Sequence, residues 1–94
     1  MKLNFEWEEE KSKANFKKHK VNFDEATTVF IDPFSITIPD SDHSEDEQRY
    51  IDIGSSDNGH VLIVVYTERG SNIRIISCRK ATSLERKRYE EGSS

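Results

Sequence analysis

The first third of the chain has apolar residues at helical spacing. Residues 8–19 begin with acids and end with cations, which is the order of charge that a helix dipole favours. Asn22 followed by Glu25 is an Asn variant of the capping box and predicts that a second, short helix begins there. Four apolar residues then share one face of that helix: Phe23, Ala26, Val29 and Phe30. Asp32 and Pro33 end it, because a residue that precedes proline disfavours the helical conformation.

After Pro33 the apolar period changes to two. Four segments with this pattern predict strands, over about 34–38, 48–56, 60–68 and 73–79. The sequence "DNG" just before the third strand is a strong signal for a tight hairpin, because Asn and Gly accept positive φ. The third strand is apolar on both faces, so we expect it to be central, with residues 61–65 buried. Short connections make an antiparallel order the simplest topology for the four strands.

The C-terminal segment contains another capping box. Thr82 with Glu85 predicts a helix that runs to about Glu91. The expected fold is therefore α+β, with two N-terminal helices, a four-stranded antiparallel sheet and a C-terminal helix, in a single domain over residues 1–94. Two helices should cover one face of the sheet. The other face should stay partly open and basic, with the last helix over its edge.

Residues 40–47, "DSDHSEDE", hold five acids among eight residues. So much like charge and so little apolar surface predict a solvated loop, the most mobile interior segment of the free protein. The spacing of the acids matches no calcium-binding loop. His43 lies among these acids, and no two of His19, His43 and His60 have metal-ligand spacing, so we expect all three to be polar surface residues.

Composition excludes several classes of protein. Hydrophobic residues make up 33% and charged residues 34%, so a few segments must carry a small core. The single cysteine, Cys78, permits no internal disulfide and no thiolate metal cage, and its apolar strand predicts a buried, unreactive thiol. The run "VLIVVY" is far shorter than the roughly 20 residues that cross a bilayer, and the acidic N-terminus is unlike an export signal. We expect a soluble cytoplasmic protein that contacts no membrane and uses no metal or other cofactor.

Positive charge is concentrated toward the C-terminus. Residues 1–60 carry seven Lys and Arg against fourteen Asp and Glu, a net charge of −7, whereas residues 61–94 carry seven against four, a net charge of +3. Four arginines lie at or near predicted strand ends: Arg49, Arg69, Arg74 and Arg79. Guanidinium groups bind phosphate oxygens bidentately and keep their charge, so these four are the candidates for holding a scissile phosphate.

Two features limit this hypothesis. Arg74 and Arg79 are five residues apart, so an unbroken strand sends them to opposite faces, and only a bulge or the strand's end would bring both to one pocket. A salt bridge at the rim is the alternative interpretation for any single arginine. Arg86, Lys87 and Arg88 are consecutive on a helix and cannot share one face, so we expect a solvated helix end there.

These residues also carry a family resemblance. The segments "FEWEEEKSKANFKKHKVNFDEATTVF", "EDEQRYIDIG", "VVYTERG" and "RIISCRKATSLERKRYEE" together resemble the BrnT family, the toxins of bacterial type II toxin–antitoxin pairs. The resemblance extends over about residues 5–91. Three positions depart from the usual pattern: Lys20 replaces a common Gly, Asn22 a common Ser and Cys78 a common Ala. A left-handed helix cap at Lys20 would be strained by about 1 kcal/mol.

The resemblance implies a fold similar to RelE-type ribonucleases and cleavage of RNA without a metal. In such enzymes the ribose 2′-hydroxyl attacks its neighbouring phosphate, so the protein must orient the backbone, neutralise the phosphorane and move two protons. The predicted catalytic residues are Arg69, Arg79, Arg74 and Arg49, and the predicted substrate-binding residues are Lys80 and Tyr66. The general base and acid stay open, with Glu68, Tyr66, His60 and Lys80 as candidates.

The resemblance also implies a partner, a small antitoxin similar to BrnA. Its ribbon-helix-helix part would bind DNA, so the toxin would contact DNA only through it. The toxin could form a homodimer or a complex with two copies of each chain. Without the resemblance, the residues alone favour a non-catalytic binding module, whose basic strand and C-terminal helix hold an acidic partner protein. A DNA-binding accessory is least favoured, because the sequence has no helix-turn-helix pattern.

Overall fold

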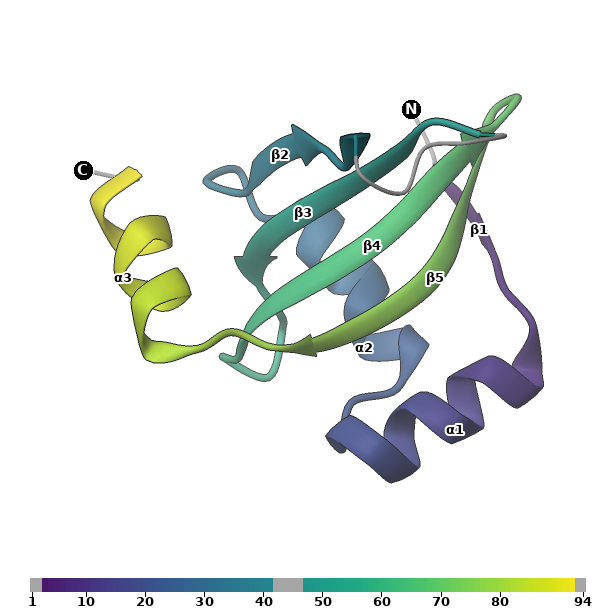
Figure 1. Cartoon of the computed structure of the whole chain (residues 1–94), viewed down its shortest axis with the longest axis horizontal. Coiled ribbons are helices and arrows are strands. Elements are labelled where there is room, and N and C mark those ends of the chain that lie inside the picture. The colour runs from purple at the N-terminus through teal and green to yellow at the C-terminus, as the bar shows by residue number, and fades with distance from the viewer. Residues whose placement is uncertain (1–2, 42–46, 93–94) are drawn as a thin grey trace.

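The computed structural model describes residues 3–41 and 47–92 of the chain. In chain order the elements are β1 (Asn4–Glu6), α1 (Glu9–His19), α2 (Phe23–Thr28), the 3₁₀ turn η1 (Val29–Ile31), β2 (Ile36–Pro39), β3 (Arg49–Ser55), β4 (Val61–Arg69), β5 (Asn72–Lys80) and α3 (Ser83–Gly92) (Figure 1). They confirm the α+β class and the order of the predicted helices and strands. Residues 42–46 lie outside the described residues, so the expectations for most of the acidic loop and for His43 stay predictions.

Local sequence signals account for the ends of α1 and α2. Lys20 caps α1 with a φ of 62°, and its N–H donates to the carbonyl of Phe16 at 2.8 Å, so the left-handed cap is present. The Asn22 side chain accepts a hydrogen bond from the N–H of Glu25 at 2.8 Å and begins α2 as predicted. Val29 and Phe30 were expected in this α-helix, but they lie in the short 3₁₀ turn η1 instead.

The sheet has five strands, in the order β1-β5-β4-β3-β2. Strands β2 to β5 pair antiparallel with their sequence neighbours, as predicted. Strand β1 adds a parallel pair at the β5 edge, with residues 4–6 opposite residues 72–74. The prediction of four strands and no parallel pair was therefore wrong. A three-residue strand is too short to show a period of two, and its partner lies 68 positions later in the chain.

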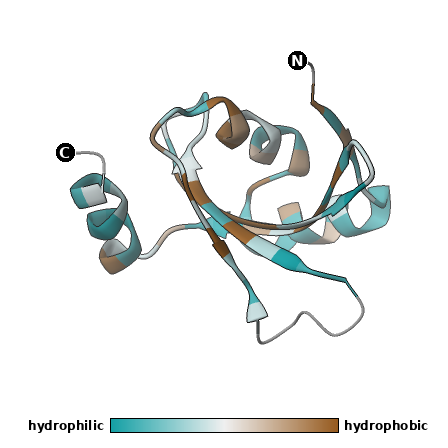
Figure 2. Cartoon of the chain, turned by 90° about the horizontal axis from the view of Figure 1, so that it is seen from above, coloured by the Kyte–Doolittle hydropathy of each residue, from teal (hydrophilic) through white to brown (hydrophobic). Residues whose placement is uncertain are grey.

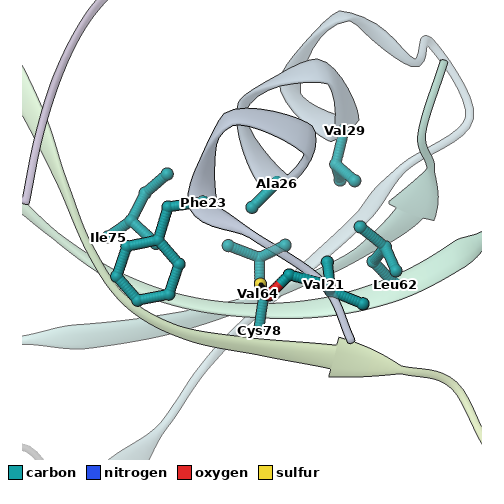
Figure 3. Packing of buried hydrophobic residues seen from close by; sticks show 8 residues of the cluster. All are labelled: Val21, Phe23, Ala26, Val29, Leu62, Val64, Ile75 and Cys78. Atoms are coloured by element: carbon teal, nitrogen blue, oxygen red, sulfur yellow. Dashed lines mark hydrogen bonds between the residues drawn. The ribbon is translucent and has the colours of Figure 1, made fainter. Parts of the chain in front are cut away.

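The hydrophobic core lies between the helices and one face of the sheet (Figure 3). Eight residues form it, none more than 2% exposed: Val21, Phe23, Ala26, Val29, Leu62, Val64, Ile75 and Cys78. Figure 2 shows α1 and α2 on the same side of the curved sheet. Strand β4 is central, as predicted, but Val61 and Val65 are only partly buried, because alternate residues face away from these helices. A Cβ on Gly54 would meet Val29 Cγ1 at 2.7 Å, so glycine permits this close approach of the layers.

Helix α3 is attached near β2, apart from α1 and α2 (Figure 1). Its predicted capping box is present: the N–H of Thr82 donates to Glu85 Oε1 at 2.9 Å, and the N–H of Glu85 donates to Thr82 Oγ1 at 3.2 Å. The hydroxyl of Tyr89 donates to Asp32 Oδ2 and joins α3 to the loop before β2. We call the face opposite α1 and α2 the open face. Within the described ranges, no helix is long and apolar enough to span a membrane.

Candidate active site on the open face

A bulge in β5 changes which residues of that strand face the helices. The register between β4 and β5 goes from Val65 opposite Ser77 to Tyr66 opposite Ile75. Ile76 is therefore an extra residue in β5 without a partner in the β4 register. As a result, the odd-numbered residues of β5 face the helices before Ile76, and the even-numbered residues face them after it.

The bulge places two arginines on the open face. Tyr66 packs against Phe30 of η1, with ring centroids 4.9 Å apart, so its neighbours Val65 and Thr67 face the open side. Arg74 is opposite Thr67, and Arg79 is opposite Ile63, four positions earlier on β4. Paired residues of antiparallel strands share a face, so both arginines belong to the open face. The predicted bulge is therefore present and puts Arg74 and Arg79 on one face, although four positions of β4 separate their partners, so they do not share one pocket.

Three of the four predicted arginines form a cluster around Thr67. Arg49 of β3 and Arg74 of β5 are the residues directly opposite Thr67 on its two neighbouring strands. Arg69 is two positions further along β4 and is a diagonal neighbour of both, at a typical separation of about 7–8 Å. Arg49, Arg69 and Arg74 are called the arginine cluster below. Their spacing allows several guanidinium groups to approach one stretch of a polyanion.

Arg79 stands apart from the arginine cluster. Its partner on β4, Ile63, is six positions from Arg69, a separation of roughly 20 Å at about 3.3 Å per residue. Two guanidinium groups that far apart meet one phosphate only if both side chains extend toward each other. The geometry therefore favours contacts from Arg69 and Arg79 to different phosphates of one strand.

Carboxylates from other segments hold three of these arginines. Arg69 binds Glu47 with two bonds, from Nε at 3.1 Å and from Nη2 at 2.9 Å. Arg79 makes a similar two-pronged pair with Glu85, at 2.7 and 2.9 Å. Arg74 reaches the N-terminal segment and binds Glu6 at 2.8 Å and Glu8 at 3.2 Å. The rim salt bridge, which sequence analysis gave as the alternative for each single arginine, is thus present for all three.

These ion pairs differ in their hydrogen bonding and in their exposure to solvent. The hydrogen bond from Arg79, with further bonds from Thr82, lowers the pKa of Glu85 to about 2, and hydrogen bonds from Asn72 and Arg74 lower the pKa of Glu6. The Arg69–Glu47 pair is the most exposed, with side chains 48% and 43% accessible. Exposed pairs of this kind contribute about 0–1 kcal/mol, so a phosphate can replace Glu47 at little cost.

Thr67, at the centre of the arginine cluster, is 2% exposed. Its hydroxyl oxygen has no hydrogen-bond partner among the described residues. A buried hydroxyl without a partner typically costs about 1–3 kcal/mol and calls for a functional explanation. Because this hydroxyl is covered by its neighbours, a phosphate could reach it only after side chains of the cluster move.

The other predicted site residues lie away from the arginine cluster. Tyr66 is on the helix-covered face, 5% exposed and stacked on Tyr50, and burial raises its pKa to about 12. A substrate on the open face would not contact it. Glu68 is opposite Ile73 on that same covered side, at the exposed end of the strand. Lys80 and His60 lie at the far end of β4 and β5, beside α3.

The family assignment rests on the sequence and agrees with the fold. The chain matches the sequence model of BrnT, the ribonuclease toxin of a type II toxin–antitoxin system, over residues 7–85. The chain belongs to the BrnT family. The crystal structure of the ribonuclease toxin BrnT of Brucella abortus has a similar fold, with a TM-score of 0.68 and 21% identity over 87% of this chain and 100% of that one. No curated protein matches the sequence.

The BrnT family consists of ribonuclease toxins of type II toxin–antitoxin systems, so membership supports ribonuclease activity and implies an antitoxin partner. The thiol of Cys78 is buried as predicted, and burial raises its pKa to about 12, whereas its lack of reactivity stays a prediction. Asn15 donates to the Cys78 carbonyl at 2.8 Å and was missed by the sequence analysis. In residues 3–41 and 47–92, no group of three His, Cys, Asp or Glu side chains is placed to hold a metal ion.

The carboxylates that bind the arginines were also missed. Glu6 and Glu8 precede α1, and sequence analysis read them only as part of an acidic N-terminus. Glu85 was recognised as a capping residue, but its second role with Arg79 was not. No local signal marks these pairs, because up to 68 positions separate the two partners.

Proposed function

We propose that this BrnT chain cleaves RNA on the open face, where the arginine cluster and Arg79 hold successive phosphates. The bulge at Ile76 is the observation that carries this proposal, because it puts both Arg74 and Arg79 on the face of Arg49 and Arg69, which α1 and α2 leave free. Arginine is suited to this role, since its planar fork binds two phosphate oxygens and its charge survives at any physiological pH. The proposal includes a fold similar to RelE-type ribonucleases.

The chemistry needs no group beyond the RNA and the protein. The 2′-oxygen forms a bond to the neighbouring phosphorus, and the bond from phosphorus to the 5′-oxygen breaks. One proton leaves the 2′-hydroxyl and another reaches the departing 5′-oxygen, which yields a cyclic phosphate and a 5′-hydroxyl. Guanidinium groups would align the backbone and stabilise the charge that develops on the phosphorane oxygens.

Binding of RNA would exchange one set of ion pairs for another. Phosphate oxygens would replace Glu47 on Arg69, and Glu6 or Glu8 on Arg74. A carboxylate released in this way stays beside the bound phosphate and can accept a proton. Glu6 and Glu47 are therefore the proposed candidates for the general base, in place of the more distant His60, Lys80 and Glu68.

Cleavage of RNA by the purified protein in EDTA tests this proposal. The parent protein should cut RNA without divalent metal, and Arg69→Ala should cut it about 10²–10³ times more slowly. Lys17→Ala is the control, because it removes an exposed cation from α1. Equal rates for the parent and Arg69→Ala, with both proteins folded, would disprove the role of the arginine cluster.

A second function is favoured by one specific observation. The arginines already bind carboxylates of their own chain, which is how they would bind an acidic partner protein. A non-catalytic module would use Arg74, Arg79 and α3 to hold such a partner. If the parent protein binds RNA weakly, cuts none and binds an acidic protein tightly, this module replaces the ribonuclease proposal.

We further propose that the antitoxin is a small ribbon-helix-helix protein similar to BrnA, which forms a cytoplasmic complex with two copies of each chain. DNA would bind through the antitoxin alone. A cavity of about 580 Å³ between the sheet and α3 offers an apolar contact, lined by Ile36, Ile38, Ile53, Arg88, Glu91 and Gly92. An amphipathic segment of the antitoxin would pack its apolar side against the isoleucines and pair its polar side with Arg88 and Glu91.

Co-purification from the native operon tests the partner proposal. Both proteins should be recovered together, and Ile38→Glu should weaken the complex because Ile38 is 44% exposed on the cavity wall. Phe16→Glu is the matched control, since Phe16 is equally exposed but lies on α1. Recovery of the toxin alone at every salt concentration would contradict the partner proposal.

A further inference from the structure

A second cavity lies where the β3–β4 hairpin meets α3. Its volume is about 490 Å³, and seven residues line it: Gly59, His60, Val61, Lys80, Arg86, Tyr89 and Glu90. Three separate elements supply these side chains, namely the hairpin, the last residue of β5 and one side of α3. None of the arginines of the open face lines it.

Two cations of this cavity differ from the arginines of the open face. The side chains of Lys80 and Arg86 make no hydrogen bond or ion pair with another described residue, whereas Arg69, Arg74 and Arg79 each bind a carboxylate. Cations gathered in a concave site focus a positive potential that favours a small anion. Glu90 is the one acidic residue on this lining, so the two cations outnumber it.

A third side chain of the cavity, His60, is held in a fixed orientation. Its Nδ1 lies 2.9 Å from Glu25 Oε2, and that oxygen also accepts a hydrogen bond from Ser56 Oγ at 2.6 Å. Burial raises the pKa of Glu25, but the bonds from Ser56 and His60 outweigh it and keep the group ionised. A carboxylate at Nδ1 leaves Nε2 as the free nitrogen of the ring, able to donate to a ligand when the imidazole is protonated.

Hydrogen bonds also fix the α3 side of the cavity. Tyr89 donates its hydroxyl hydrogen to Asp32, which accepts two backbone bonds as well, from Ser55 at 2.8 Å and Phe34 at 2.9 Å. Gly59 has a φ of 81°, and the space where its Cβ would lie is empty to 4 Å, which keeps the hairpin side open. The aromatic ring of Tyr89 and this open side provide room for a group larger than phosphate alone.

We propose that this cavity binds a phosphate group through Lys80, Arg86 and His60. Two full charges and one imidazole match the charge and donor needs of a phosphate. Lys80 follows Arg79 in β5, and Arg86 follows Glu85 in α3, so the cavity adjoins the Arg79 end of the open face. The phosphate could belong to a free nucleotide or to an RNA strand that continues past Arg79, and the second source rests on the proposed ribonuclease function.

NMR titration of the intact toxin tests the proposal. The three probes are inorganic phosphate, a nucleoside 3′-monophosphate and a short RNA with 2′-O-methyl groups, which cannot be cleaved because its attacking hydroxyl is blocked. Each is added at constant ionic strength while the ring resonances of His60 and the side-chain resonances of Lys80 and Arg86 are followed. At least one probe should cause saturable shifts at all three residues.

Charge variants separate a specific site from general attraction. Lys80→Gln and Arg86→Gln should each weaken binding roughly tenfold, the loss expected for one charge-assisted bond. Lys87→Gln removes the same charge from the next position of α3 outside the cavity lining and should change affinity less than twofold. Because the side chains of Lys80 and Arg86 make no hydrogen bond or ion pair within the described residues, these variants should fold normally.

The outcomes identify the source of the phosphate. Saturable shifts with the methylated RNA identify an RNA phosphate, and shifts with the small probes alone identify a free nucleotide or phosphate. No saturable shift at His60 with any probe, or equal losses for Lys87→Gln and Lys80→Gln, would overturn the proposal. Repeating the titration with Arg69→Ala keeps the two proposals apart, because that variant should lose cleavage and still bind phosphate at His60.

Discussion

The two faces of the sheet use charge in opposite ways. The open face has four arginines at or near its surface, and three of them form ion pairs with carboxylates that water also reaches. The covered face carries the apolar core and also the buried carboxyl of Asp52, which is 2% exposed and accepts a hydrogen bond from Thr37 Oγ1 at 3.2 Å. Burial raises the pKa of Asp52 to about 6.

This difference predicts two classes of variant. On the open face, solvent screens each pair, so removal of a charge should change ligand binding and cleavage more than the free energy of unfolding. On the covered face, a buried charge lacks solvent, so its removal should change the free energy of unfolding and leave cleavage intact. The following variants test that separation.

The largest effect is expected from Arg74→Ala. Loss of this guanidinium should slow RNA cleavage about 10²–10³-fold, because a donor aimed at the developing phosphorane charge is removed. Arg74→Lys should recover only part of the rate, since an ammonium cannot form the two-pronged contact. Cleavage rates in EDTA and melting temperatures of the same preparations measure both quantities. A large fall in melting temperature together with parental cleavage would show that Arg74 stabilises the fold and does not act in cleavage.

Asp52→Asn should stabilise the covered face. The raised pKa means that folded Asp52 holds its proton more tightly than the unfolded chain, for which the ordinary value is 3.8. Stability from this group is therefore greatest below about pH 4, falls as pH rises through 6 and stays low above it. Asparagine has no proton to lose, so the free energy of unfolding of Asp52→Asn should exceed that of the parent by about 1–3 kcal/mol at pH 7.5 and equal it near pH 3.5.

Denaturant unfolding at both pH values measures this gain. Asp57→Asn is the control, because Asp57 is an exposed carboxylate of the hairpin turn and should show no such pH dependence. An equal gain for Asp52→Asn at both pH values would mean that the charge of Asp52 is not its cause. The rate of RNA cleavage should stay at the parental value in both variants.

Lys20→Gly should stabilise the protein by about 1 kcal/mol, again without a change in cleavage. The φ of Lys20 is 62°, a conformation that strains any side chain with a Cβ and suits glycine. Lys20→Ala removes the same charge but keeps the Cβ, so it should give no such gain. Equal stability of the glycine and alanine variants would show that the cap is not strained.

The smallest effect is expected from Glu47→Gln. Loss of this carboxylate frees Arg69 from its most exposed pair, so RNA affinity should rise two- to fivefold at low salt, equivalent to less than about 1 kcal/mol. Glu10→Gln removes the same charge from α1 and should have a weaker, general effect. RNA binding at two salt concentrations compares them, and equal gains would show that the Arg69–Glu47 pair does not compete with RNA.

Much of the fold could be predicted because its signals are local. Helix caps at Asn22 and Thr82, the change of period after Pro33 and the "DNG" hairpin depend on neighbours within four residues. The left-handed cap at Lys20 is likewise a property of one helix end. Local backbone preferences act before any tertiary contact exists, so they appear directly in the sequence.

The site itself depended on distant contacts. Sequence analysis proposed the four arginines and required a bulge or the strand's end to bring Arg74 and Arg79 to one side, but the extra residue Ile76 is set by how β5 pairs with β4. The parallel strand β1, the carboxylates that bind Arg69 and Arg74, and the cavity beside His60 join residues up to 68 positions apart. The sequence by itself determined which elements form and which residue types are available for phosphate. Only the tertiary structure decided which of them meet, because pairing register depends on burial across the whole sheet and no local pattern encodes it.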